Sequence, residues 1–125
     1  MVYLNDYCLD LALAYLDTSG NRLDICSTEP TTYTQATVTY TLGNKTALSI
    51  GAPTDRSPNG RKVIVAAITD GTVTGTATAA FWSIVDTGNS RLIATGSLSA
   101  TQSVTSGNTF TLDAFDIGIP DAVSA

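Results

Sequence analysis

The sequence contains no histidine, and charged residues make up only 14% of its 125 positions. The lack of histidine removes the usual Ser-His-Asp and Cys-His nucleophile systems and the commonest transition-metal ligand. Cys8 and Cys26 are the only cysteines, too few for a disulfide scaffold or, by themselves, for a four-ligand zinc site. We therefore expect no enzymatic activity, no cofactor and no structural metal. A Cys8–Cys26 bridge is the alternative to a reduced pair, which we favour because free cysteine is commonly a small buried hydrophobe and no secretory signal is present.

Basic residues are also scarce. Six Lys and Arg against eleven Asp and Glu give a net charge of −5, and this balance argues against wrapping nucleic acid, which needs basic stripes. No apolar run reaches the ~18–20 residues of a membrane span. The N-terminus lacks a basic region followed by an apolar core, so no secretory signal is recognisable. We expect neither a nucleic-acid partner nor a membrane.

Three aspartates gather near the C-terminus without forming a recognisable site. Asp113, Asp116 and Asp121 lie close in sequence but lack the loop pattern of a calcium site. Hydrolysis by paired carboxylates is chemically possible, yet nothing singles out a pair. We interpret these aspartates as surface and turn residues, and a hydrolase is the least favoured class.

The clearest helix in the sequence is expected over residues 5–17. Asn5 can cap its first turn, and Gly20 suits a left-handed residue just after its end. Two apolar stripes recur at helical spacing. The stripe of Leu9, Leu13 and Leu16 is predicted to be buried. The second stripe, Tyr7, Leu11 and Tyr15, either covers one end of a β core or packs on another subunit.

A β-hairpin over residues 75–99 is expected to form the centre of the fold. Its first arm is apolar on both faces and carries the only tryptophan, Trp82, so it should be covered on each side. Residues 86–90 are turn formers, and residues 91–98 return. We predict that this hairpin forms the core, with Trp82 largely buried.

The rest of the chain predicts further strands separated by turns. Turns are expected at 43–46 and at Asp70-Gly71, and the longest loop at 51–60. About seven or eight strands with turns every ~8–12 residues are typical of all-β folds. We predict a mainly β protein, an antiparallel β-sandwich of jelly-roll or immunoglobulin-like type with one N-terminal helix, as a single domain over 1–125. The remaining strands are expected at 22–27, 33–40 (an edge or outward-facing strand), 47–50, 61–68 and 109–114.

Half of the six basic residues lie in one loop and strand start: Arg56, Arg61 and Lys62. In an acidic protein, such a patch can meet an acidic partner surface. The alternative is that these are solvated charges beside an apolar strand.

Several runs of the chain resemble small proteins encoded in tailed-phage genomes. These runs are 22–33, 40–53, 60–63, 90–96, 103–110 and 115–120, and together they span nearly the whole chain. The resemblance implies a structural virion protein, assembled in the host cytoplasm. The first choice is a capsid decoration (cement) protein that stabilises the head, with the major capsid protein or another virion protein as its partner. The alternative is a tail, head-fibre or receptor/glycan-binding module.

A decoration protein repeats under the symmetry of the particle, so we expect a homo-oligomer, most simply a trimer. The second helix stripe (Tyr7, Leu11 and Tyr15) would provide contacts between subunits. The basic residues Arg56, Arg61 and Lys62 would contact an acidic capsid patch.

Overall fold

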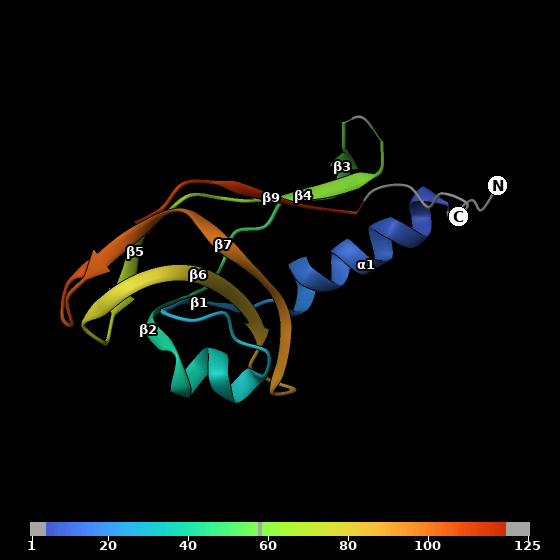
Figure 1. Ribbon diagram of the computed structural model, residues 1–125. Helices are drawn as coiled ribbons and strands as arrows, with labels where there is room; N and C mark the ends of the chain where they lie inside the picture. The colour runs from blue at the N-terminus through green and yellow to red at the C-terminus, as the bar shows by residue number, and fades with distance from the viewer. Residues whose placement is uncertain (1–4, 58, 120–125) are drawn as a thin grey trace.

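The structure is a computed structural model that describes residues 5–57 and 59–119 (Figure 1). In this part of the chain, one α-helix and one π-helical turn accompany nine strands. In chain order the elements are α1 (Asp6–Ser19), β1 (Arg22–Cys26), η1 (Gln35–Thr39), β2 (Thr41–Thr46), β3 (Thr54–Asp55), β4 (Arg61–Val65), β5 (Ile68–Val73), β6 (Ala77–Asp86), β7 (Arg91–Val104), β8 (Thr109–Leu112) and β9 (Phe115–Ile119).

The strands form two antiparallel sheets. The larger sheet has six strands in the order β7-β6-β1-β2-β5-β8, and the smaller has three in the order β3-β4-β9. Figure 1 shows the larger sheet curled into a half-barrel, with the smaller sheet at one end and α1 alongside it. The predicted fold class is confirmed: the protein is mainly β, antiparallel and sandwich-like, with one N-terminal helix.

One bent ribbon joins the two sheets. The β4–β9 pair of the small sheet continues into the β5–β8 pair of the half-barrel. The bend lies at residues 66–67 on one strand and 113–114 on the other, which fall between the named strands. Strands that switch sheets through a bend make the corners of such folds. The strand expected over 61–68 is therefore divided between the two sheets.

Two glycines that were read as turn residues lie inside strands. Gly71 lies within β5. Its position requires glycine, because a Cβ there would lie 2.3 Å from ring carbons of Phe110. Gly43 is within β2, where a Cβ would lie 2.5 Å from the Thr72 carbonyl oxygen. The predicted turns at 43–46 and at Asp70-Gly71 are wrong, since these glycines permit close packing rather than a chain reversal.

The strand predicted over 33–40 is also wrong, because this segment is helical and ends in η1. The Thr32 side chain accepts a hydrogen bond from the Gln35 N–H at 3.1 Å. The Gln35 side chain reaches back to accept from the Thr31 N–H at 2.8 Å. This reciprocal pair resembles a capping box, which starts a helix despite the β-forming composition.

The strand predicted over 47–50 is reduced to one bridge between Ile50 and Val65. Ala47 has a φ of 56°, so the chain cannot continue as an extended strand from β2.

Helix α1 is confirmed, and it ends two residues beyond the predicted end. The Asn5 side chain accepts a hydrogen bond from the Tyr7 N–H at 2.8 Å, as an N-cap does. The predicted left-handed end is wrong, because Gly20 has a φ of −76°. Glycine is needed there for space, since a Cβ would lie 2.5 Å from the Leu16 carbonyl oxygen.

The β6–β7 hairpin lies in the larger sheet, next to the central strand β1. Ile84 of β6 pairs with Leu23 of β1, and both are fully buried. Trp82 is largely but not fully buried, and it packs at the margin of this core.

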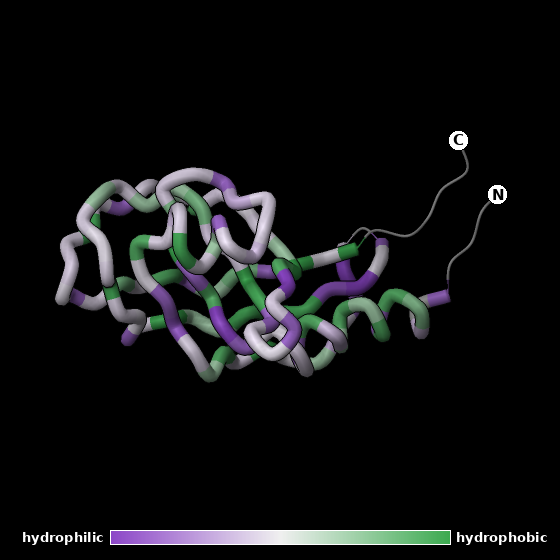
Figure 2. The backbone as a smooth tube through the Cα atoms, turned by 90° about the horizontal axis from the view of Figure 1, so that it is seen from below, coloured by the Kyte–Doolittle hydropathy of each residue, from purple (hydrophilic) through white to green (hydrophobic). Residues whose placement is uncertain are grey.

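A continuous hydrophobic core runs between the half-barrel, α1 and the small sheet. Along the backbone, hydrophobic segments alternate with hydrophilic ones, while α1 is hydrophobic over most of its length (Figure 2). The buried members of the core are Leu13, Leu16, Leu23, Ile25, Leu42, Ile50, Val63, Val65, Ile68, Val73, Ala79, Ile84, Val104, Phe110 and Leu112.

Candidate functional site

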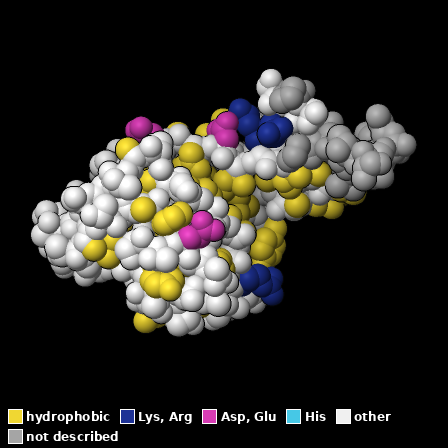
Figure 3. Space-filling view, in the orientation of Figure 1, with side chains coloured by type: hydrophobic (Ala, Val, Ile, Leu, Met, Phe, Trp, Pro, Cys, Tyr) yellow, Lys and Arg dark blue, Asp and Glu magenta, His cyan; other side chains and the backbone are white. Residues whose placement is uncertain are grey.

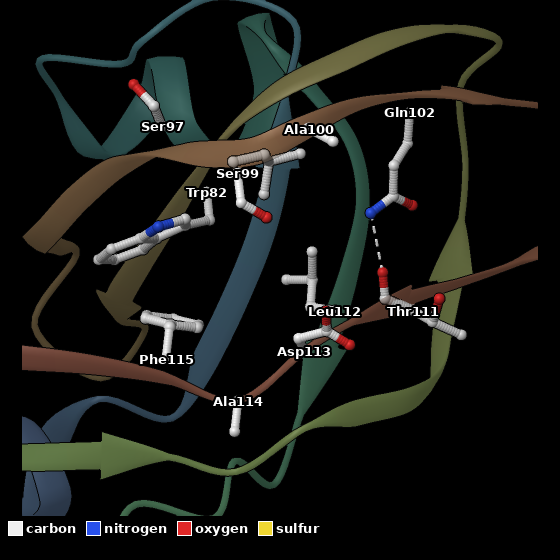
Figure 4. Close-up of a pocket in the computed structure, with 11 residues that line it drawn as sticks. Trp82, Ser97, Ser99, Ala100, Gln102, Thr111, Leu112, Asp113, Ala114 and Phe115 are labelled. Atoms are coloured by element: carbon white, nitrogen blue, oxygen red, sulfur yellow. Dashed lines mark hydrogen bonds between the residues drawn. The ribbon is translucent and has the colours of Figure 1, made fainter.

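A cavity of about 390 Å³ opens between the two edge strands of the half-barrel, β7 and β8. We call this cavity the seam pocket. The Gln102 side chain spans it at one end, where Nε2 donates to the Thr111 carbonyl oxygen at 2.9 Å (Figure 4). The half-barrel is thus held nearly closed at this point, and the pocket lies beside the closure.

A large bulge in β7 shapes the upper rim of the pocket. Ala79 pairs with Gln102 and Phe81 pairs with Ser97, so four residues of β7 (98–101) oppose Ala80 alone. Bulges bend a strand and redirect its side chains, and they are over-represented at barrel rims. In Figure 4 the Ser99 hydroxyl points into the space between β7 and β8, while the Ser97 hydroxyl points away from it.

Two aromatic rings form one wall of the pocket. The ring centroids of Trp82 and Phe115 lie 4.6 Å apart at an interplanar angle of 36°. The indole fits against β7 because residue 96 is glycine: a Cβ there would lie 2.6 Å from Trp82 Cζ2. Among the described residues, no protein acceptor receives the Trp82 Nε1–H. The wall is therefore apolar, with one free donor.

The rest of the lining is uncharged apart from one carboxylate. Leu112 projects into the pocket, and Asp113 lies at its lower rim (Figure 4). Asp113 is exposed and forms no ion pair within the part of the chain that the structure describes. No Lys or Arg among the described residues lines the pocket.

The predicted aspartate group does not come together as a site. Asp116 pairs with Lys62 at 3.1 Å, whereas Asp113 lies at the seam pocket. Asp121 lies outside the described residues. Within those residues, no three His, Cys, Asp or Glu side chains gather as metal ligands.

The second helix stripe is divided. Tyr7 and Leu11 are 68% and 55% exposed. Tyr15 is engaged within the chain instead, because its hydroxyl accepts from Arg91 Nη1 at 2.8 Å and donates to Asp86 Oδ2 at 3.3 Å. Tyr7 and Leu11 thus remain candidate contacts to a partner. Tyr15 instead connects α1 to the β6–β7 hairpin through hydrogen bonds.

The three basic residues predicted to contact a partner form most of their interactions within their own chain. Arg61 binds Asp10 at 2.8 Å and Asp55 at 2.5 Å; the hydrogen bond to Asp10 contributes most to raising the pKa of its guanidinium. Lys62 also has a carboxylate partner. Arg56 donates to the Asn59 carbonyl oxygen at 3.0 Å. Figure 3 accordingly shows basic and acidic side chains close together on the small sheet, so this region is not a uniformly basic patch.

The sequence reasoning missed a buried polar cluster on the face of β1 opposite Leu23 and Ile25. The Arg22 guanidinium donates two hydrogen bonds of 2.8 Å to the fully buried carboxylate of Asp24, and Thr41 Oγ1 donates a third at 2.7 Å. Burial raises the pKa of Asp24, and the bonds from Arg22 and Thr41 oppose that rise. All of its partners lie within the fold, so this cluster is structural.

The buried thiol of Cys26 lies on the same face of β1. Its Sγ donates to the Ala36 carbonyl oxygen of η1 at 3.7 Å and lies 3.9 Å from Ser83 Oγ. Burial raises its pKa to about 11. Cys8 is exposed on α1, and both cysteines are free. The alternating pattern of residues 22–26 predicts only that the Leu23 and Ile25 face of β1 is buried. The other face is also buried because η1 packs on it, and the sequence analysis predicted a strand in place of η1.

No helix in the described ranges is long and apolar enough to cross a membrane. Comparison with protein-family models, curated proteins and solved structures finds no match to this chain.

Proposed function

We propose that this protein is a non-enzymatic structural component of a tailed-phage virion, most simply a capsid decoration protein that works as a homotrimer. The runs that resemble tailed-phage proteins span nearly the whole chain, and they motivate the virion assignment. The observation that carries the assembly is the exposed apolar face of α1.

That face consists of Tyr7, Cys8, Leu11 and Ala12, all of which are exposed. Residues three and four apart on a helix are neighbours, so these four form one strip. The opposite side of α1 already packs on the domain through Leu9, Leu13 and Leu16, which are buried. A small domain gains stability by covering such a strip, and symmetry-related copies of α1 can cover one another.

The segment predicted as a strand over 33–40 and most of the predicted basic residues add no support to the assembly. The segment 33–40 is helical and offers no strand edge. Of the three basic residues, only Arg56 lacks a carboxylate partner among the described residues. In the proposal, Arg56 is therefore the remaining candidate for a contact to an acidic capsid surface.

The test combines solution mass with occupancy on purified particles. We expect the wild-type protein to be a trimer by native mass spectrometry and to be present on particles in many copies. Leu11→Lys should give a monomer with reduced occupancy. Val38→Lys is the matched control, because Val38 is 71% exposed on η1 and should leave the mass unchanged. A wild-type monomer that is absent from purified particles would overturn the proposal.

The seam pocket favours a second candidate function, a tail, head-fibre or receptor-binding module. A pocket with an aromatic wall and a few polar groups is the usual form of a small-molecule site. Imaging of particles that carry the labelled protein separates the candidates. Label over the head indicates decoration, and label at a tail or fibre tip indicates a receptor-binding module.

A further inference from the structure

We propose that the seam pocket binds a neutral saccharide of one or two rings. The inference deepens the second candidate function, yet it does not depend on where the protein sits on a particle. It rests on three features of the pocket: its aromatic wall, its mixed polar groups, and the absence of basic residues from its lining.

The wall offers an apolar surface to a flat, partly apolar ligand. Trp82 and Phe115 pack against each other, and Leu112 projects beside them (Figure 4). One face of the indole rests on Gly96 and the other lies near Phe115, so the ligand would meet the ring edges and Leu112. One face of a pyranose ring presents mainly C–H groups, and packing it on this apolar wall removes apolar area from water. The volume of about 390 Å³ falls within the range of small-molecule pockets.

Polar groups around this wall can both donate and accept. The Asp113 carboxylate accepts, and the Ser99 hydroxyl both donates and accepts. Gln102 donates one N–H of its side-chain amide to the Thr111 carbonyl oxygen. The second N–H and the oxygen of the Gln102 amide are available to a ligand. Saccharide hydroxyls also donate and accept, so they can satisfy all of these groups at once.

The charge of the lining disfavours other ligand classes. Within the part of the chain that the structure describes, no Lys or Arg lines the pocket, and Asp113 would repel a phosphate or a nucleotide. A quaternary ammonium ion is usually held among several aromatic faces. Here the two rings stack on each other at 4.6 Å, so they do not enclose a cation between them.

The protein has one tryptophan, and its fluorescence therefore reports on this pocket directly. The intact protein is titrated with glucose, galactose, mannose, N-acetylglucosamine, maltose and lactose. Tetramethylammonium chloride and inorganic phosphate are the comparison ligands. We expect at least one saccharide to change the emission of Trp82 saturably at millimolar concentration, and neither comparison ligand to do so.

Variants at exposed positions assign the response to the pocket. Asp113→Asn and Ser99→Ala should each weaken binding by about tenfold, the loss expected for one good hydrogen bond. Asp17→Asn, at an exposed position on α1, should bind as tightly as the wild type. The proposal is overturned if no saccharide in the panel saturates, if tetramethylammonium binds instead, or if both pocket variants bind normally. Particle occupancy is measured separately, so failure here leaves the decoration proposal standing.

Discussion

Cys8 and Cys26 differ in both access and acidity. Cys8 is exposed on α1, whereas Cys26 is fully buried, with its pKa raised by burial to about 11. Because the thiolate is the reactive form, Cys26 should stay unreactive at pH 8. Because the proposed trimer would cover Cys8, the Leu11→Lys monomer is labelled: we expect iodoacetamide to modify one thiol per folded chain and both after denaturation, as counted by mass spectrometry. Cys8→Ser should abolish native labelling, and native labelling of two thiols would contradict this assignment.

Gly71 gives a second prediction at the scale of one residue. A Cβ at this position would lie 2.3 Å from the ring of Phe110, which is only 2% exposed and has little room to move. Overpacking of this kind costs about 1–3 kcal/mol, so Gly71→Ala should lower the free energy of unfolding by that amount in urea denaturation.

Gly51→Ala is the matched control for that substitution, because the nearest atom to its added Cβ lies 3.9 Å away. It should change stability by no more than about 0.5 kcal/mol. Equal effects of the two substitutions would show that Gly71 has no special packing role.

At the scale of elements, Asp86 organises the turn between β6 and β7. Its carboxylate accepts from Asn89 Nδ2 at 2.7 Å and from the Gly88 N–H at 3.0 Å. These bonds, that from the Asn89 side chain above all, lower the pKa of Asp86. Its contribution to stability is therefore present above the unfolded pKa of about 3.9 and is lost as pH falls through the lower folded value.

The prediction is that Asp86→Asn lowers the melting temperature at pH 7 and that the difference from wild type narrows below about pH 4. Melting curves from pH 7 to pH 2 test this. Asp17→Asn serves as the control, with no loss at neutral pH. A difference between Asp86→Asn and wild type that stays constant with pH would mean that the charge of Asp86 is unimportant.

The elements that the sequence predicted well are those set by local signals. Helix α1 follows from its leucine spacing and the Asn5 cap, and the β6–β7 hairpin follows from its apolar arms and the turn at 86–90. The errors arise where contacts with residues distant in the sequence determine the local structure. Gly43 and Gly71 were read as turns because the chain segments that press on them, residues 72–73 and the Phe110 ring, cannot be located from local sequence. In contrast, the Thr32–Gln35 cap was a local signal that composition had obscured.

The seam pocket could not have been predicted from the sequence. It joins Trp82, Ser99 and Asp113, which are far apart in the chain and reach one place only because the half-barrel curls its two edges together. Trp82 had been singled out as a core residue and Asp113 as a surface residue. Each description is partly right, since the pocket lies where the core meets the surface.

At the scale of the whole molecule, the pairing of β4 with β9 sets an order of events during synthesis. The paired residues are 50 to 58 positions apart, and they pair only after the other strands in the described part of the chain have been made. Until then one edge of β4, the strand that carries the buried Val63 and Val65, lacks its partner in the ribosome-bound chain. Contacts between such distant segments slow folding, and exposed apolar strands attract other chains. The interval before β9 is released is thus when this protein most needs protection from aggregation.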